Sequence, residues 1–132
     1  MHVDGHCFCG KISFEAEADP ATVIVCHCTD CQELTGTAYR AVVTASNMKI
    51  LSGSPKGWVK TADSGRSRKH YFCPDCGSPI CSGPTEGGFA TVSLRIGTLT
   101  QRRELKPGKQ IWTRSALPWV QDLHGFEGHE KQ

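Results

Sequence analysis

The chain has 132 residues, of which 38% are hydrophobic and 21% are charged. This length fits one domain, 1–132, and the composition is that of a globular protein rather than a disordered chain or a coiled-coil rod. Its longest apolar runs are far shorter than the roughly 20 residues that a membrane-spanning helix needs. The formal net charge of +2 excludes a general nucleic-acid polycation.

The first residues contain no export signal. Met1 to His6 lack a basic region that leads into an apolar stretch. Eight cysteines in a chain without such a signal favour a reducing compartment, where disulfides are rare. We therefore expect a cytoplasmic protein that contacts no membrane, and nucleic acid is a disfavoured partner.

Short strands separated by turns dominate the expected structure. Alternating or β-branched segments that predict strands lie at residues 12–16, 23–25, 39–44, 48–51, 58–61, 68–72 and 89–95. Glycine and proline mark turns at residues 52–55, 82–84 and 86–88. This pattern predicts a mainly β fold. Residues from about 124 onward have little periodicity and are expected to form a loose tail.

One short helix is expected after residue 28. Thr29 and Gln32 fit a capping box, in which Thr29 is the N-cap and Gln32 reaches back to it. Gly36 is a natural stop. The capping box is a weak signal alone, but this helix directly follows a group of cysteines.

The spacing of the eight cysteines is the most informative pattern. They form Cys-x-Cys at residues 7 and 9, Cys-x-Cys-x-x-Cys at residues 26, 28 and 31, and Cys-x-x-Cys at residues 73 and 76, with Cys81 apart. An even number is compatible with four disulfides. The tight spacing and the missing export signal favour tetrahedral thiolate–zinc sites instead.

Two of these groups together complete one closed metal site. Cys7 and Cys9 face the same side of an extended segment. Cys73 and Cys76 form a zinc knuckle. The four thiolates would join the start of the chain to its middle, and a closed zinc of this kind contributes folding free energy. We therefore expect a structural zinc at Cys7, Cys9, Cys73 and Cys76.

The remaining group offers three sulfurs from six residues. Cys26 and Cys28 share a face of an extended segment, and Cys31 follows on the first helical turn, while His27 points away. A helix N-terminus stabilises thiolates. Because three protein ligands leave a fourth position open, we expect a catalytic-type zinc at Cys26, Cys28 and Cys31.

Two alternatives concern this second group. Cys81 could close it and make both zincs structural, although a buried cysteine that binds no metal is the favoured interpretation. The three cysteines could also bind no metal and be redox-active, which their dense spacing disfavours.

The charge of the second group restricts its chemistry. Zinc with three thiolates carries a formal charge of −1 and is a poorer Lewis acid than zinc with three histidines. It can hold a fourth thiol as thiolate. The expected partner is therefore a small-molecule thiol or thiol adduct that reacts at its sulfur or at the carbon attached to it.

Three blocks of sequence resemble a known family in their residues and order. They are Gly5–Phe14, Cys26–Gln32 with Thr35–Gly36, and Phe72–Pro79, and the later segments Ile111–Trp112 and Ser115–Trp119 are similar to bacterial members. The family is the glutathione-dependent formaldehyde-activating (GFA) family, also called the CENP-V/GFA domain. The resemblance implies an Mss4-like fold of twisted antiparallel sheets with zinc-bearing loops. It also implies a structural and a catalytic-type zinc on the same two sets of cysteines.

The resemblance further implies an activity. This is the condensation of formaldehyde with glutathione to S-(hydroxymethyl)glutathione, a carbon–sulfur lyase reaction in which the open zinc meets the sulfur. Glutathione, as co-substrate, would need cations for its carboxylates. The candidates, each of which could also be a surface charge, are Arg40, Lys60, Arg66, Arg95 and Arg114.

Other residues support weaker hypotheses. Glu33 is a candidate proton shuttle, although a glutamate on a helix surface is more ordinary. Trp58, Trp112 and Trp119 could line a pocket, but core packing is the favoured interpretation. The basic run from Arg66 to His70 is simplest as a solvated strand or loop edge.

Two other functions stay open. The chain could be a non-catalytic, zinc-stabilised binding module for a protein or nucleic acid, with the basic run as its surface. It could also perform the same chemistry with another thiol. The oligomeric state is left open by the sequence.

Overall fold

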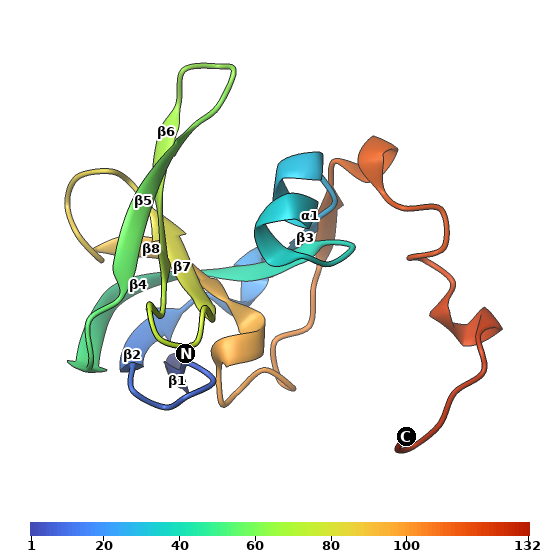
Figure 1. The fold of residues 1–132 in the computed structure, drawn as a ribbon, viewed down its shortest axis with the longest axis horizontal. Helices are drawn as coiled ribbons and strands as arrows, with labels where there is room; N and C mark the ends of the chain where they lie inside the picture. Colours follow the sequence, from blue (N-terminus) through green and yellow to red (C-terminus); the bar gives the residue numbers. More distant parts are fainter.

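The computed structural model describes residues 1–132 and is built around a nine-stranded sheet (Figure 1). The strands are β1 (His2–His6), β2 (Ser13–Ala18), β3 (Ile24–Cys26), β4 (Arg40–Ser52), β5 (Lys56–Thr61), β6 (Ser67–Phe72), β7 (Pro79–Gly83), β8 (Thr91–Arg95) and β9 (Lys109–Ile111). The single α-helix is α1 (Thr29–Thr35), and four 3-10 turns are η1 (Pro20–Thr22), η2 (Ile96–Thr98), η3 (Thr113–Ser115) and η4 (Leu123–Gly125).

Nearly all strand pairs are antiparallel. The main path runs β1-β2-β4-β8-β7-β6-β5, while β3 pairs with β4 and, in parallel, with β9. The β5–β6 hairpin extends beyond the rest of the sheet, next to α1 (Figure 1). The expected mainly β fold with an antiparallel sheet and one helix is confirmed.

The long strand β4 forms where the sequence predicted two separate strands. Asn47, in its middle, has a left-handed φ of 52°. The register between β4 and β2 shifts between Glu15 and Glu17, next to this point. An irregularity of this kind bends a strand without ending it, so the polar interruption in the sequence does not break the sheet.

Several strand boundaries differ from the sequence predictions. β1 and β9 lie where no strand was expected, because β1 is mostly polar and β9 has only three residues. Ser82 and Gly83, which were predicted in a turn, are the last residues of β7. The strand predicted at residues 89–95 begins only at Thr91.

The core is formed by alternate side chains of the central strands. Phe14 of β2, Val43 of β4 and Leu94 of β8 are fully buried, and Val43 lies opposite Leu94 in the register. Cys7 and Cys73 belong to the same buried cluster. The four-cysteine group therefore begins inside the core rather than on the surface.

Helix α1 has a different N-cap from the expected one. Cys28, not Thr29, is the N-cap, and its sulfur accepts a hydrogen bond of 3.3 Å from the Cys31 N–H. The predicted capping box is wrong, because the Gln32 side chain donates to the carbonyl of His27 instead. At seven residues α1 is too short to span a bilayer, and no other helix is long and apolar enough to do so.

The three tryptophans are not core residues. Trp58, Trp112 and Trp119 are 42%, 52% and 48% exposed, so the prediction that they pack in the core is wrong. Trp58 stacks on the His70 ring with centroids 5.2 Å apart, and the Arg114 guanidinium lies 5.0 Å from the Trp112 ring. These large side chains are left available for contacts outside the core.

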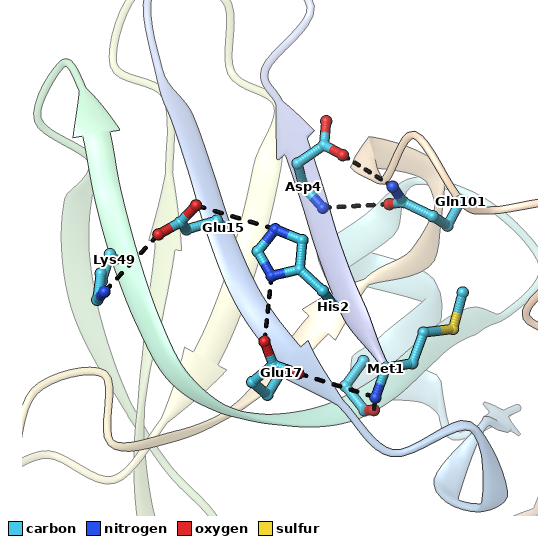
Figure 2. A network of polar contacts seen from close by, with 8 residues as sticks. Met1, His2, Asp4, Glu15, Glu17, Lys49 and Gln101 are labelled. Carbon is cyan, nitrogen blue, oxygen red and sulfur yellow. Dashed lines mark hydrogen bonds and ion pairs between the residues drawn. The ribbon is translucent and has the colours of Figure 1, made fainter.

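The two ends of the chain are held differently. His2 lies between Glu15 and Glu17, with Nδ1 3.1 Å from the Glu17 carboxylate, and the Met1 amino group and Lys49 extend this network (Figure 2). These ion pairs are largely exposed, so each contributes at most about 1 kcal/mol. Residues 121–132 are all exposed, and the C-terminal segment extends away from the sheet (Figure 1).

Two glycines with positive φ allow the cost of backbone strain to be compared with the cost of a steric clash. At Gly53 (φ 75°) a Cβ would lie 2.5 Å from the Lys11 carbonyl oxygen, whereas at Gly87 (φ 90°) it would meet nothing within 4 Å. We expect Gly87→Ala to lower the free energy of unfolding by about 1–2 kcal/mol, the cost of the left-handed conformation. Gly53→Ala should lower it by clearly more. If both zinc-loaded variants lose the same free energy of unfolding in urea, the steric interpretation of the turn at Gly53 is wrong.

Candidate metal centres

The first candidate centre brings together the four cysteines that the sequence paired. The sulfurs of Cys7, Cys9, Cys73 and Cys76 all lie within 4.8 Å of one another. The Cys7–Cys9 distance is 3.5 Å and the Cys9–Cys73 distance is 3.8 Å. A zinc tetrahedron with Zn–S bonds of about 2.3 Å separates its sulfurs by about 3.8 Å. The group therefore fits a closed four-thiolate zinc site.

Both halves of this centre are tight turns closed by glycine. Cys7 and Cys9 are not in the extended segment that was expected, because the Gly10 N–H donates to the Cys7 carbonyl at 3.0 Å and Gly10 has a φ of 78°. The Gly77 N–H likewise donates to the Cys73 carbonyl at 2.8 Å. The turns, rather than the alternation of a strand, aim each pair of sulfurs at one point.

Ser78 links the two turns and was not identified from the sequence. Its hydroxyl oxygen accepts from the Phe8 N–H at 2.9 Å and lies 3.3 Å from the Cys76 sulfur. Hydrogen bonds from the hydroxyl and the backbone of Ser78 lower the pKa of Cys76 to about 5. Cys76 is thus prepared to bind metal as a thiolate.

The second candidate centre contains three cysteines. Cys26 ends β3, Cys28 caps α1 and Cys31 lies in its first turn, and their sulfurs lie within 4.8 Å of one another. The Cys28 and Cys31 sulfurs are 3.0 Å apart. Burial raises the pKa of Cys31, whereas hydrogen bonds from Cys31 outweigh burial and lower the pKa of Cys28. Three sulfurs leave one corner of a tetrahedron open.

The C-terminal strand fastens the loop that carries these three sulfurs. β9 pairs with β3, and the His27 N–H donates to its last carbonyl at 3.1 Å. The buried His27 ring is 2.7 Å from the Gln110 side chain, so it points away from the sulfurs. Gln32 also donates to the Ser115 carbonyl at 3.0 Å. His27, just before α1, and Gln32, within it, are therefore tied to one segment near the end of the chain.

Cys81 lies outside both groups. It is buried on β7, and burial raises the pKa of its thiol to about 12. The alternative in which Cys81 closes the second centre does not fit this geometry. All eight cysteines are free thiols, so the four-disulfide alternative is not formed either.

A pocket of about 320 Å³ opens beside the three sulfurs. This volume lies within the range of small-molecule sites. Its walls carry four cationic side chains and one carboxylate, namely Arg40, Lys60, Arg66, Arg68 and Asp30. Asp30 and Lys60 pair at 2.5 Å, so three guanidinium groups remain without a carboxylate in the pocket. The pocket is suited to an anionic ligand.

Only some of the expected substrate residues line this pocket. Arg40, Lys60 and Arg66 do, whereas Arg95 and Arg114 do not. Glu33 is exposed and also lies outside the pocket walls. Three residues of the basic run, Arg66, Arg68 and His70, line the pocket, and His70 is buried. The interpretation of this run as a solvated strand or loop edge is therefore wrong.

Arg68 is the pocket cation that the sequence hypothesis missed. It is half-buried, and its guanidinium donates to the Ser82 carbonyl at 3.1 Å. Its place in the pocket depends on contacts between distant segments, so the strand predicted at residues 68–72 gave no local signal for it.

Comparisons with known proteins place the chain in one family. A family model described as glutathione-dependent formaldehyde-activating enzyme matches residues 2–115. No curated protein sequence matches the chain. The crystal structure of a Rhodobacter sphaeroides protein is similar, with a TM-score of 0.60 and 19% identity over 81% of this chain and 98% of that chain. At this identity the likeness concerns the fold alone.

The two centres should respond differently to loss of one sulfur. Cys76→Ala opens the four-cysteine group inside the core, so we expect the protein to lose its cooperative unfolding transition. Cys28→Ala changes only a group at the edge of a pocket, so it should fold with one zinc fewer than wild type. Metal analysis and urea unfolding check both. If the two variants unfold alike, the division into two roles is wrong.

His70 should make the protein less stable in mild acid. Burial, followed by the nearby charge of Arg95, lowers its pKa to about 4, against an ordinary value of about 6.5. The unfolded chain therefore binds the proton first, and the free energy of unfolding falls as the pH drops from about 6.5 to 4. In His70→Phe, which keeps an aromatic ring against Trp58, this part of the slope should be absent. If the free energies of unfolding of both proteins, measured with urea, change in parallel across this pH range, the assignment of the pH dependence to His70 is wrong.

Proposed function

Since the chain belongs to the family of glutathione-dependent formaldehyde-activating enzymes, we propose that it is a zinc-dependent carbon–sulfur lyase that forms or breaks S-(hydroxymethyl)glutathione. The observation that supports this most is the position of three clustered thiols beside a pocket with a surplus of cations. Glutathione is a thiol with two carboxylates, and such a pocket matches both features. A cytoplasmic location and an Mss4-like fold belong to the same proposal.

The metal chemistry that we assign to the site is binding of sulfur. Zinc bound by Cys26, Cys28 and Cys31 would keep the sulfur of glutathione ionised at the fourth position. Cys7, Cys9, Cys73 and Cys76 would hold the structural zinc. In the forward direction the glutathione sulfur bonds to the carbonyl carbon of formaldehyde, and the thiol proton ends on the aldehyde oxygen.

The side chains of the pocket provide the attraction and orientation. The positive charge of Arg40 favours the ionised forms of Cys28 and Cys31. Arg66 and Arg68 lie on the side wall formed by the β5–β6 hairpin, where they can receive a carboxylate. Asp30, held by Lys60, supplies the acceptor for an ammonium group. An α-amino acid end, with its two opposite charges, therefore finds partners for both.

The two alternative functions differ in how well they match this geometry. Arg66, Arg68 and His70 all line the pocket, so the basic run is not a separate surface for nucleic acid. This favours a small molecule over a binding module. Another low-molecular-weight thiol with an anionic end would meet the same side chains, so a panel of thiols is part of the test.

Calorimetric titration tests the proposal directly. Zinc-loaded wild type should bind glutathione saturably, and Cys28→Ala should lose this binding because it lacks one ligand of the open site. Arg66→Gln should weaken binding by about tenfold, the value of one charge-assisted hydrogen bond. Arg103→Gln, an exposed arginine outside the pocket, is the matched control. A fully zinc-loaded wild type that binds no glutathione would refute the proposal.

A further inference from the structure

Arg95 is a buried cation that forms no ion pair with a carboxylate. It ends β8 opposite Val42 and is only 7% exposed. One guanidinium nitrogen, Nη2, donates to Nδ1 of His70 at 3.5 Å, while Nε and Nη1 have no hydrogen-bond partner. Buried guanidinium groups are normally paired, since an unpaired buried charge is costly.

No carboxylate of the chain compensates this charge. None of the ion pairs in the structure includes Arg95. His70 is neutral at pH 7 because burial lowers its pKa to about 4. The Cys81 thiol is neutral because burial raises its pKa to about 12. Arg95 itself stays charged, since burial lowers its pKa only to about 10.

A second pocket, of about 210 Å³, is lined in part by Arg95. Leu34 and His70 separate it from the pocket beside the three sulfurs, because both residues line both pockets. Its other walls are mostly apolar and include Trp58 and Pro79. None of its lining residues is acidic.

We infer that this second pocket is a subsite for a carboxylate, in which the Arg95 guanidinium receives the glycyl end of a glutathione-type thiol whose sulfur lies at Cys26, Cys28 and Cys31. This inference rests on the proposed function, which it deepens. A molecule that spans Leu34 and His70 would occupy both pockets, with its thiol beside the cysteines and one end at Arg95.

The charges of the two pockets decide which end lies where. The γ-glutamyl end of glutathione carries an ammonium beside its carboxylate, and only the first pocket offers both an acid, Asp30, and arginines. The glycyl end carries a carboxylate alone. The second pocket offers a cation between apolar walls and no acid, so it matches the glycyl end.

The pocket can be tested without any thiol. N-acetylglycine carries the carboxylate and the amide of the glycyl end, and N-acetylglycinamide is its neutral counterpart. In zinc-loaded protein, N-acetylglycine should shift the Arg95 Nε–H signal in nitrogen-15 NMR saturably, and N-acetylglycinamide should not. Arg95→Met should abolish this binding. If that variant does not fold, the comparison of the two ligands on wild type still decides.

Titrations with two thiols then test whether the glycyl end of the substrate lies at Arg95. Wild type should bind glutathione at least about tenfold more tightly than its C-terminal amide, in which the glycyl carboxylate is neutral. Arg95→Met should lose this factor for glutathione and leave the binding of the amide unchanged. Arg95→Lys, which keeps the charge without the two-pronged geometry, should recover part of it.

The outcomes separate this inference from the proposed function. Equal losses for both thiols in Arg95→Met, or a lower zinc content, would mean that Arg95 only balances the charge of the three thiolates, and would overturn the subsite. If Arg95→Met binds glutathione as tightly as wild type does, the subsite is also overturned, while the proposed function stands. Binding of N-acetylglycine without binding of any thiol would support the carboxylate pocket and refute the proposed function.

Discussion

The cluster of Cys7, Cys9, Cys73 and Cys76 fixes the distance between two segments that lie far apart in the sequence. One segment joins β1 to β2 at one edge of the sheet, and the other joins β6 to β7. The hairpin that β6 forms with β5 supplies one wall of the pocket. The geometry of the pocket therefore depends on a four-cysteine group that does not line it.

The rest of the site is characterised by charged side chains that have no partner of opposite charge within the protein. Three sulfurs that would be thiolates in a metal complex share a pocket with Arg40, Arg66 and Arg68, and a fourth arginine, Arg95, is buried at the neighbouring pocket. The only acid in the main pocket, Asp30, is already paired with Lys60. Neither the anionic centre nor the cationic walls would be stable alone in a partly buried position. A negatively charged ligand completes this balance rather than disturbing it.

Cysteine spacing and strand alternation predicted much of this molecule, because both are local patterns. The three groups of sulfurs and the position of α1 followed from residues within six positions of one another. The N-cap was missed because a cysteine sulfur replaced the expected threonine hydroxyl. Ser78, Arg68 and the pairing of β9 with β3 depend on contacts between distant segments, as does the exposure of the tryptophans. No periodicity within one segment encodes such contacts.

The parallel pairing of β3 with β9 has a consequence for the order in which the protein acquires its two centres during synthesis. The four-cysteine group is complete once the ribosome has added Cys76. The loop of the three-cysteine group lacks its fastening until β9 and Ser115 have emerged, although its sulfurs were made much earlier. A nascent chain would thus assemble the four-cysteine group first, and the three-cysteine group would reach its final position only in a nearly finished protein.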